Sequence, residues 1–162
     1  MNRALFFVCA LSLLAPARGE AQECDTTCDE GARGEDGCCT TSLEEAVALC
    51  TNAEPERCVE AGDRLEARDE VRRALAMYTR ACSAGHAMGC RRGGAILLSP
   101  RGGVTPNSAD AMSMFRAACD QHLGQGCFDV GRMFERGAGT HQDPVRAQTF
   151  YQQACTDGFP PA

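Results

Sequence analysis

The chain has 162 residues and a formal net charge of −6 at pH 7, with 22 acidic residues against 16 basic ones. All of the basic residues are arginines, and they form no cluster interleaved with aromatic side chains, so we expect no nucleic-acid partner. The most unusual feature is the 12 cysteines, a number typical of disulfide-rich exported proteins or of metal-binding proteins.

The first 21 residues have the pattern of an export signal. Arg3 precedes an apolar run of about 12 residues, and small residues follow at Ala15-Pro16-Ala17 and Gly19-Glu20-Ala21, either of which fits a cleavage site. The run is too short to cross a bilayer as a helix and no later segment is longer, so we expect no membrane span. The sequence therefore predicts an exported protein, periplasmic or secreted, that loses Cys9 with its signal and keeps an odd number of cysteines.

Residues 22–41 form a polar, acidic lead-in without the apolar periodicity that could build a core. Only disulfide cross-links could order this lead-in. Its four cysteines are Cys24, Cys28, Cys38 and Cys39. Adjacent cysteines bridge each other only with strain, so we expect Cys38 and Cys39 each to join Cys24 or Cys28, in either order. The acidic residues lack the spacing of a calcium-binding loop and are expected to be solvated.

A repeated cysteine spacing organises the rest of the chain. Cys82 and Cys90 are eight positions apart, Cys119 and Cys127 have the same spacing 37 residues later, and Cys50 and Cys58 have it 32 residues earlier. A period in the mid-thirties indicates stacked helix pairs. We therefore expect an all-α repeat region over residues 42–162, with units at about 42–69, 70–106 and 107–143 and a partial unit at 144–162.

Each unit is expected to have a first helix that ends near its first cysteine and a second helix that holds the other cysteine. The first helices share an apolar stripe typical of amphipathic helices. Its members are Ala74, Met77, Tyr78 and Ala81, then Ala111, Met114, Phe115 and Ala118, then Ala147, Phe150, Tyr151 and Ala154. Capping signals mark helix starts at Ser42, at Asn107 or Ser108, and at Asp143 before Pro144.

The second helices carry a glycine four residues beyond their cysteine, at Gly62, Gly94 and Gly131. Because glycine in mid-helix costs about 1 kcal/mol relative to alanine, its recurrence suggests that two backbones approach closely there. Leu65, Leu97 and Phe134, seven residues beyond the cysteine, are expected to supply larger core side chains.

The two cysteines of a unit are expected near the turn between antiparallel helices, within reach of each other. We expect the disulfides Cys50–Cys58, Cys82–Cys90 and Cys119–Cys127, each worth about 2–3 kcal/mol on a chain-entropy model. The alternative is zinc, but zinc ligands usually come in pairs two to four residues apart and thiolates need a reducing setting, so we expect no metal and no cofactor.

Cys155 begins a fourth pair whose second cysteine would fall at position 163, so we expect it to be unpaired. The last unit then has a first helix without a second one. We expect it either to belong to a longer repeat array or to rely on a partner that covers the helix, which includes self-association.

The pattern aromatic-x-x-Ala-Cys, a turn, Gly-Cys-x-x-x-Gly and a glycine-rich loop resembles the Sel-1-like repeats, a branch of the tetratricopeptide-like helical repeats. The match covers Leu43 to Ala162, although His122 and Gly124 stand where the other clear copy has Gly85 and Ala87. The resemblance implies a right-handed α/α solenoid, and the cysteine spacing is similar to that of exported bacterial relatives in which a disulfide staples each repeat.

The first of two candidate functions is a binding scaffold. The solenoid architecture and the resemblance both imply an adaptor that holds a protein or peptide on a concave face lined by exposed positions of the first helices. The candidate binding residues are the arginines of those helices, Arg73, Arg80, Arg116 and Arg146. We expect no intrinsic catalysis.

The alternative is an enzyme, because some cysteine-rich relatives are described as penicillin-binding proteins with weak β-lactamase activity. A serine β-lactamase needs Ser-x-x-Lys, and this chain has no lysine. His86, His122 and His141 are scattered over turns and a loop, unlike zinc ligands, and the cysteines near the first two are those expected to be bridged. The β-lactamase hypothesis therefore ranks second.

Overall fold

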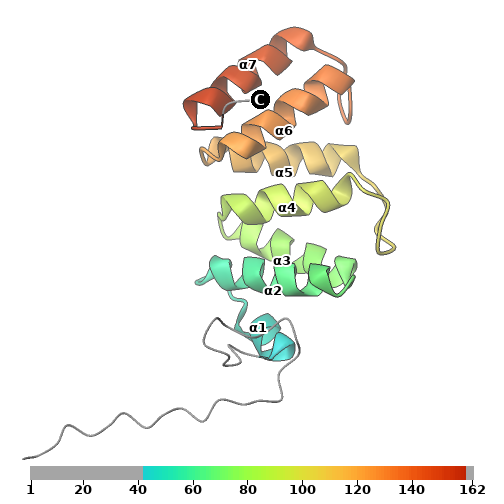
Figure 1. Cartoon of the computed structure of the whole chain (residues 1–162), viewed down its shortest axis with the longest axis vertical. Coiled ribbons are helices and arrows are strands. Elements are labelled where there is room, and N and C mark those ends of the chain that lie inside the picture. Colours follow the sequence, from blue (N-terminus) through green and yellow to red (C-terminus); the bar gives the residue numbers. More distant parts are fainter. Residues whose placement is uncertain (1–41, 160–162) are drawn as a thin grey trace, which may run out of the picture.

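The computed structural model describes residues 42–159, and this part of the chain is built from helices. Consecutive helices stack on one another in chain order to form an elongated solenoid (Figure 1). The export signal, the lead-in cysteines and residues 160–162 lie outside the described residues. The helices are α1 (Leu43–Leu49), α2 (Pro55–Ala67), α3 (Val71–Ser83), α4 (Ala87–Leu97), α5 (Ser108–Asp120), α6 (Gly124–Arg136) and α7 (Pro144–Thr156).

The predicted fold class, an all-α solenoid of disulfide-stapled helix pairs, is confirmed. Helices α1, α3, α5 and α7 are the first helices of the units, and α2, α4 and α6 are the second helices. Each disulfide joins the end of a first helix to the fourth residue of the following second helix. The Cα–Cα distances are 4.5 Å for Cys50–Cys58 and 4.4 Å for both Cys82–Cys90 and Cys119–Cys127.

Polar side chains cap several helices where the sequence places them. The Ser42 hydroxyl accepts from the N–H of Glu45 at 3.1 Å, and Asp143 accepts from the N–H of Arg146 at 2.9 Å. Of the two candidates before α5, Asn107 is the cap, since its Oδ1 accepts from the N–H groups of Ala109 and Asp110. These bonds satisfy N–H groups that the helix itself leaves free.

The α3–α4 and α5–α6 turns share a left-handed residue at the same position in spite of their different sequences. Gly85 and His122 occupy the same position of the turn and both have positive φ, +83° and +60°. A β-carbon on Gly89 would lie 2.5 Å from the Cβ of Ala81, and one on Gly126 would lie 2.7 Å from the Cβ of Ala118. In these two units the glycine before the second cysteine therefore allows the helices to approach closely, whereas the first unit has Arg57 at this position and still forms its disulfide.

The glycines in mid-helix require a correction to the sequence-based expectation. A β-carbon on Gly62 would lie 2.5 Å from the ring of Tyr78, one on Gly94 would lie 2.8 Å from the ring of Phe115, and one on Gly131 would lie 2.6 Å from the ring of Tyr151. An aromatic ring of the next first helix thus lies nearest to each glycine, and at Gly131 the backbone carbonyl oxygen of Ala147 also lies within 3.2 Å of such a β-carbon. We call this contact the repeat joint.

The core runs through the whole stack. One buried cluster contains Leu65, Val71, Tyr78 and Ile96, and another contains Phe115, Val130, Met133 and Phe134. Leu97 is only partly buried. Within residues 42–159, no helix is both long enough and apolar enough to cross a bilayer.

Candidate functional site

The exposed side of the first helices carries small side chains. In three of these helices, the residue six positions before the cysteine of that helix is small and exposed. These residues are Ala76 in α3, Ser113 in α5 and Thr149 in α7. Small side chains here leave the surface between neighbouring first helices accessible.

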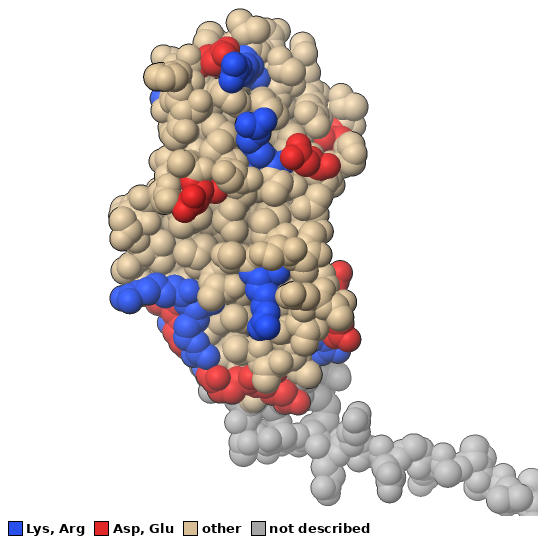
Figure 2. Space-filling model, turned by 180° about the vertical axis from the view of Figure 1, so that it is seen from behind, with Lys and Arg blue, Asp and Glu red and all other residues tan. Residues whose placement is uncertain are grey.

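An open groove of about 380 Å³ lies between α3 and α5. Leu75 and Thr79 line it from α3, Leu97 lines it from α4, and Asp110, Ser113 and Met114 line it from α5. Leu75, Leu97 and Met114 are partly buried and make its apolar surface, whereas the three polar side chains are exposed. Seen from behind, the middle of the molecule has a broad uncharged band, and most charged atoms lie above and below it (Figure 2).

The polar side chains of the groove already make bonds within their own helices. The Thr79 hydroxyl donates to the carbonyl oxygen of Leu75 at 2.8 Å, and the Ser113 hydroxyl donates to that of Ala109 at 3.1 Å. Asp110 accepts from the side-chain amide of Asn107 at 2.6 Å. The groove therefore offers mainly oxygen lone pairs to a ligand.

Two of the four candidate arginines are held by carboxylates of the protein. Arg73 pairs with Glu70 at 2.6 Å and with Glu44 at 3.0 Å, and the hydrogen bonds that it donates to Glu44 and then to Glu70 raise the pKa of the guanidinium. Arg146 pairs with Asp143 at 3.1 Å. The guanidinium of Arg146 also lies 5.6 Å from the ring centroid of Phe134.

The other two arginines are available to a ligand. Arg80 in α3 and Arg116 in α5 are exposed, and neither forms an ion pair with a residue in the described range 42–159. They do not line the groove, whose residues the sequence did not single out as a site. The lining residues of α3 and α5 occupy different positions of the repeat, so no recurring position in the sequence marks the groove.

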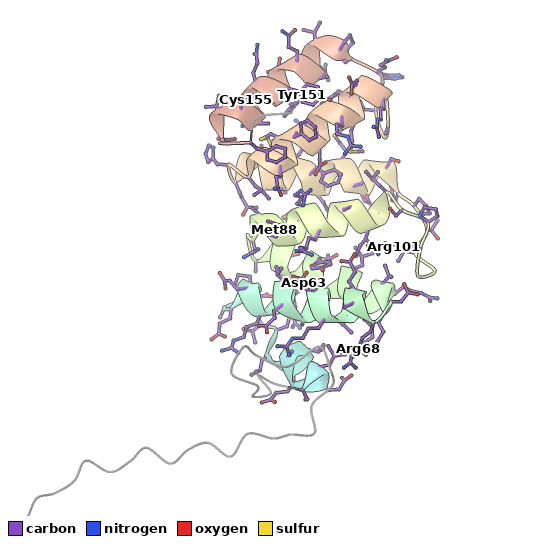
Figure 3. The ribbon with its side chains drawn as sticks, in the orientation of Figure 1. Asp63, Arg68, Met88, Arg101, Tyr151 and Cys155 are labelled. Atoms are coloured by element: carbon purple, nitrogen blue, oxygen red, sulfur yellow. A yellow bond between two sulfur atoms is a disulfide. The ribbon has the colours of Figure 1, made fainter. Side chains whose placement is uncertain are left out.

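A polar network on α2, α3 and α4 has a structural role. The buried hydroxyl of Tyr78 lies 2.5 Å from Asp63 and 3.0 Å from Glu66, and these carboxylates pair with Arg92 and Arg101, respectively. Burial, followed by the hydrogen bond that the hydroxyl donates to Asp63, raises the pKa of Tyr78 and keeps its hydroxyl neutral. Asp63 and Arg101 are labelled in Figure 3.

A second carboxylate is held on the side formed by α4 and α6. Asp129 pairs with Arg91 at 3.1 Å and with Arg132 at 3.8 Å. Burial raises the pKa of Asp129, while the charges of these two arginines oppose the change. The arrangement joins successive second helices.

The histidines and the free cysteine lie apart from the groove. His86 caps α4, with its Nδ1 accepting from the N–H of Gly89 at 3.4 Å, and His122 Nδ1 lies 3.2 Å from Asp157. Cys155 is exposed on α7 and has no disulfide partner among residues 42–159. In the same range, no three His, Cys, Asp or Glu side chains are grouped so that they could hold a metal ion.

Comparison with known proteins gives the family. The model of the Sel1 repeat matches three segments of the chain, residues 58–86, 91–123 and 124–159. The chain belongs to the Sel1 repeat family. Sel1 repeats generally mediate protein–protein interactions, and this molecule is a Sel1-repeat scaffold. Each matched segment pairs a second helix with the first helix that follows it, whereas the sequence-based units begin with a first helix.

Solved structures with Sel1 repeats share the fold. A Sel1 repeat protein from Oxalobacter formigenes is 20% identical, with a TM-score of 0.63 over 72% of this chain and 48% of that one. The cysteine-rich protein B of Helicobacter pylori is 19% identical, with a TM-score of 0.58 over 72% of this chain and 88% of that one. A protective antigen of uropathogenic Escherichia coli is 18% identical, with a TM-score of 0.52 over 73% of this chain and 34% of that one.

At these identities, the structural matches establish the fold alone. The chain spans about half the length of the Oxalobacter protein and about a third of the Escherichia coli antigen. No curated protein matches the chain in sequence.

Proposed function

We propose that this protein is an exported scaffold that binds a protein or peptide segment in the groove between α3 and α5. The observation that carries the proposal is the apolar surface of Leu75, Leu97 and Met114 in an open groove on the side of the first helices. Stacked helix pairs commonly use such a face for extended ligands. No observation on the described residues favours the β-lactamase alternative, and we propose no reaction.

Two features support export. Three disulfides join residues within the range 42–159, and such bonds persist in oxidising compartments such as the periplasm or the extracellular medium. The signal-like pattern of residues 1–21 agrees with this location.

The groove can be tested by blocking it. Peptides are first selected from a displayed random library against the oxidised full chain, and a selected peptide is labelled with fluorescein. The substitution Ser113→Trp places a large side chain at an exposed position that lines the groove. We expect it to weaken peptide binding by at least tenfold, measured by fluorescence anisotropy, because it removes the space for the ligand.

The matched control is Ala95→Trp, which places the same side chain at an exposed position of the second helix α4. We expect this variant to bind like the unmodified protein. If Ala95→Trp abolishes binding and Ser113→Trp does not, the ligand uses the opposite side of the solenoid and the proposal is wrong.

A further inference from the structure

We propose that the α3–α5 groove selects a segment in which a lysine or arginine lies next to an aliphatic residue, with the cation paired to Asp110. This inference rests on the proposed function, because it names the chemistry of the ligand that the groove binds. It follows from the hydrogen-bonding state, the charge and the apolar surface of the residues that line the groove.

The polar side chains of the groove are acceptors. A hydroxyl group has one proton, and those of Thr79 and Ser113 are donated to carbonyl oxygens of their own helices. An ionised carboxylate such as that of Asp110 only accepts. A ligand that is complementary to these three residues must therefore bring donors.

Asp110 differs from the residues at the same position of the neighbouring first helices. Asp110 lies nine residues before the cysteine near the end of its helix. The same position is Arg73 in α3 and Arg146 in α7, and each of these pairs with an opposite charge of the protein. Asp110 has one neutral partner, the amide of Asn107, and forms no ion pair with a residue in the described part of the chain. Its negative charge is therefore left for a ligand.

The nearby free cations favour one direction for the ligand. Arg116 is six residues beyond Asp110 on α5, or about 9 Å along the helix axis, and Arg80 lies near the corresponding end of α3. Arg80 and Arg116 thus lie toward the C-terminal ends of their helices, and Asp110 lies in the first turn of α5. Arg72, in the first turn of α3, donates to the carbonyl oxygen of Gly102. A bound segment is expected to have its basic residue at the Asp110 end and no basic residue at the other.

The apolar part of the groove explains the neighbouring aliphatic residue. Its surface consists of two leucines and Met114, and no aromatic ring lines it. A methionine side chain adapts to several shapes, so leucine, isoleucine and methionine are all expected in the ligand. The volume of about 380 Å³ leaves room for one such side chain together with the stem of a lysine or arginine.

The test compares selections from the same displayed library. The full oxidised chain and the variants Asp110→Asn, Asp110→Lys and Asp120→Asn are each used as the target. Asp120→Asn is the matched control, because Asp120 is an exposed carboxylate at the other end of α5 and does not line the groove. The frequency of each residue type in the enriched peptides is measured by sequencing.

We expect peptides enriched on the unmodified protein and on Asp120→Asn to contain a basic residue next to an aliphatic one. This preference should disappear with Asp110→Asn and change to an acidic residue with Asp110→Lys. A peptide selected on the unmodified protein should bind Asp110→Asn about five- to tenfold more weakly, since the ion pair is partly exposed. Added salt should weaken binding less for Asp110→Asn than for the unmodified protein.

The inference fails if enriched peptides show no basic preference, or if the preference survives in Asp110→Asn while Ser113→Trp still blocks binding. The groove would then bind segments of another chemistry, and the proposed function would stand. If no peptide is enriched on the unmodified protein, the proposed function fails and this inference fails with it.

Discussion

Gly94 and Gly93 are adjacent residues of α4 that face different neighbours. A β-carbon on Gly94 would lie 2.8 Å from the ring of Phe115, which is buried. A β-carbon on Gly93 would lie 2.8 Å from the terminal methyl group of Met114, which can move aside. The same substitution therefore meets a fixed obstacle at one position and a flexible one at the next.

We predict that Gly94→Ala lowers the free energy of unfolding by about 1–2 kcal/mol, because overpacking against Phe115 outweighs the gain in helix propensity. Gly93→Ala should be neutral or raise it by up to about 1 kcal/mol. Urea denaturation of both variants under oxidising conditions measures the difference. Equal effects of the two substitutions would show that the ring of Phe115 does not set the repeat joint.

The requirement for glycine could be predicted from the sequence, but its partner could not. The recurrence of Gly62, Gly94 and Gly131 shows that a side chain is excluded, and this part of the expectation is correct. It does not show what fills the space. That depends on the rotation of the next first helix, which brings Tyr78, Phe115 or Tyr151 over the glycine and is fixed only by packing.

At the scale of the helices, the disulfides hold the end of each first helix against the start of the following second helix. We predict that the double substitution Cys82→Ala and Cys90→Ala lowers the free energy of unfolding by about 2–3 kcal/mol, because the unfolded chain regains the entropy of an open loop. Denaturant unfolding of the oxidised proteins measures this loss.

Cys155→Ala is the control for that experiment, since Cys155 is exposed on α7 and lies in no disulfide among the described residues. It should leave stability unchanged. A loss of similar size from Cys155→Ala would mean that this thiol is bonded to another part of the chain or to a second molecule.

Helix ends were easier to predict than the groove. Ser42, Asn107 and Asp143 act through N–H groups two or three residues away, so the relevant information is local in the sequence. The groove combines residues of α3, α4 and α5 that are up to 39 positions apart, from Leu75 to Met114. Three of its six residues are polar, and within a single helix each of them resembles an ordinary solvent-exposed residue.

At the scale of the whole molecule, stability is expected to depend on pH in the alkaline range. Tyr78 and Tyr151 are the only tyrosines, and each lies at a repeat joint. Burial is the main cause that raises the pKa of both, and the hydrogen bonds that the hydroxyls donate to carboxylates add to it. The folded state therefore keeps both hydroxyls neutral at a pH where the unfolded chain ionises them.

The raised pKa values make the free energy of unfolding fall at alkaline pH. The stabilisation is complete below about pH 10, the ordinary pKa of tyrosine, and is lost as the pH rises above it. At pH 9, we predict that Tyr78→Phe is less stable than the unmodified protein by about 1–2 kcal/mol, because a buried hydrogen bond is lost. The difference should become smaller at pH 11, since the variant lacks this titration.

Urea unfolding at pH 9 and pH 11 provides the measurement, with Tyr151→Phe as the comparison because Tyr151 is less buried. A difference between Tyr78→Phe and the unmodified protein that is the same at both pH values would contradict a raised pKa for Tyr78 in the folded state.

The repeat joint also bears on how such a chain can lengthen by duplication. The Tyr78 hydroxyl bonds to Glu66 and the Tyr151 hydroxyl to Glu135, each carboxylate being eight residues beyond the second cysteine of the preceding unit. At the middle joint Phe115 has no hydroxyl, and the residue that corresponds to Glu66 and Glu135 is Leu98, directly after α4. The two sides of each joint are therefore matched in polarity.

A tandem copy of residues 70–106 would break this match, because it would bring a second Tyr78 against Leu98 and leave its hydroxyl without a carboxylate. A copied segment that runs from a second helix into the next first helix carries Glu66 and Tyr78 together. The matched family segment 58–86 has this form. The segment that can be duplicated as a unit is thus the one that contains a complete joint, from a second helix to the following first helix. The disulfides, in contrast, connect each first helix to the second helix that follows it.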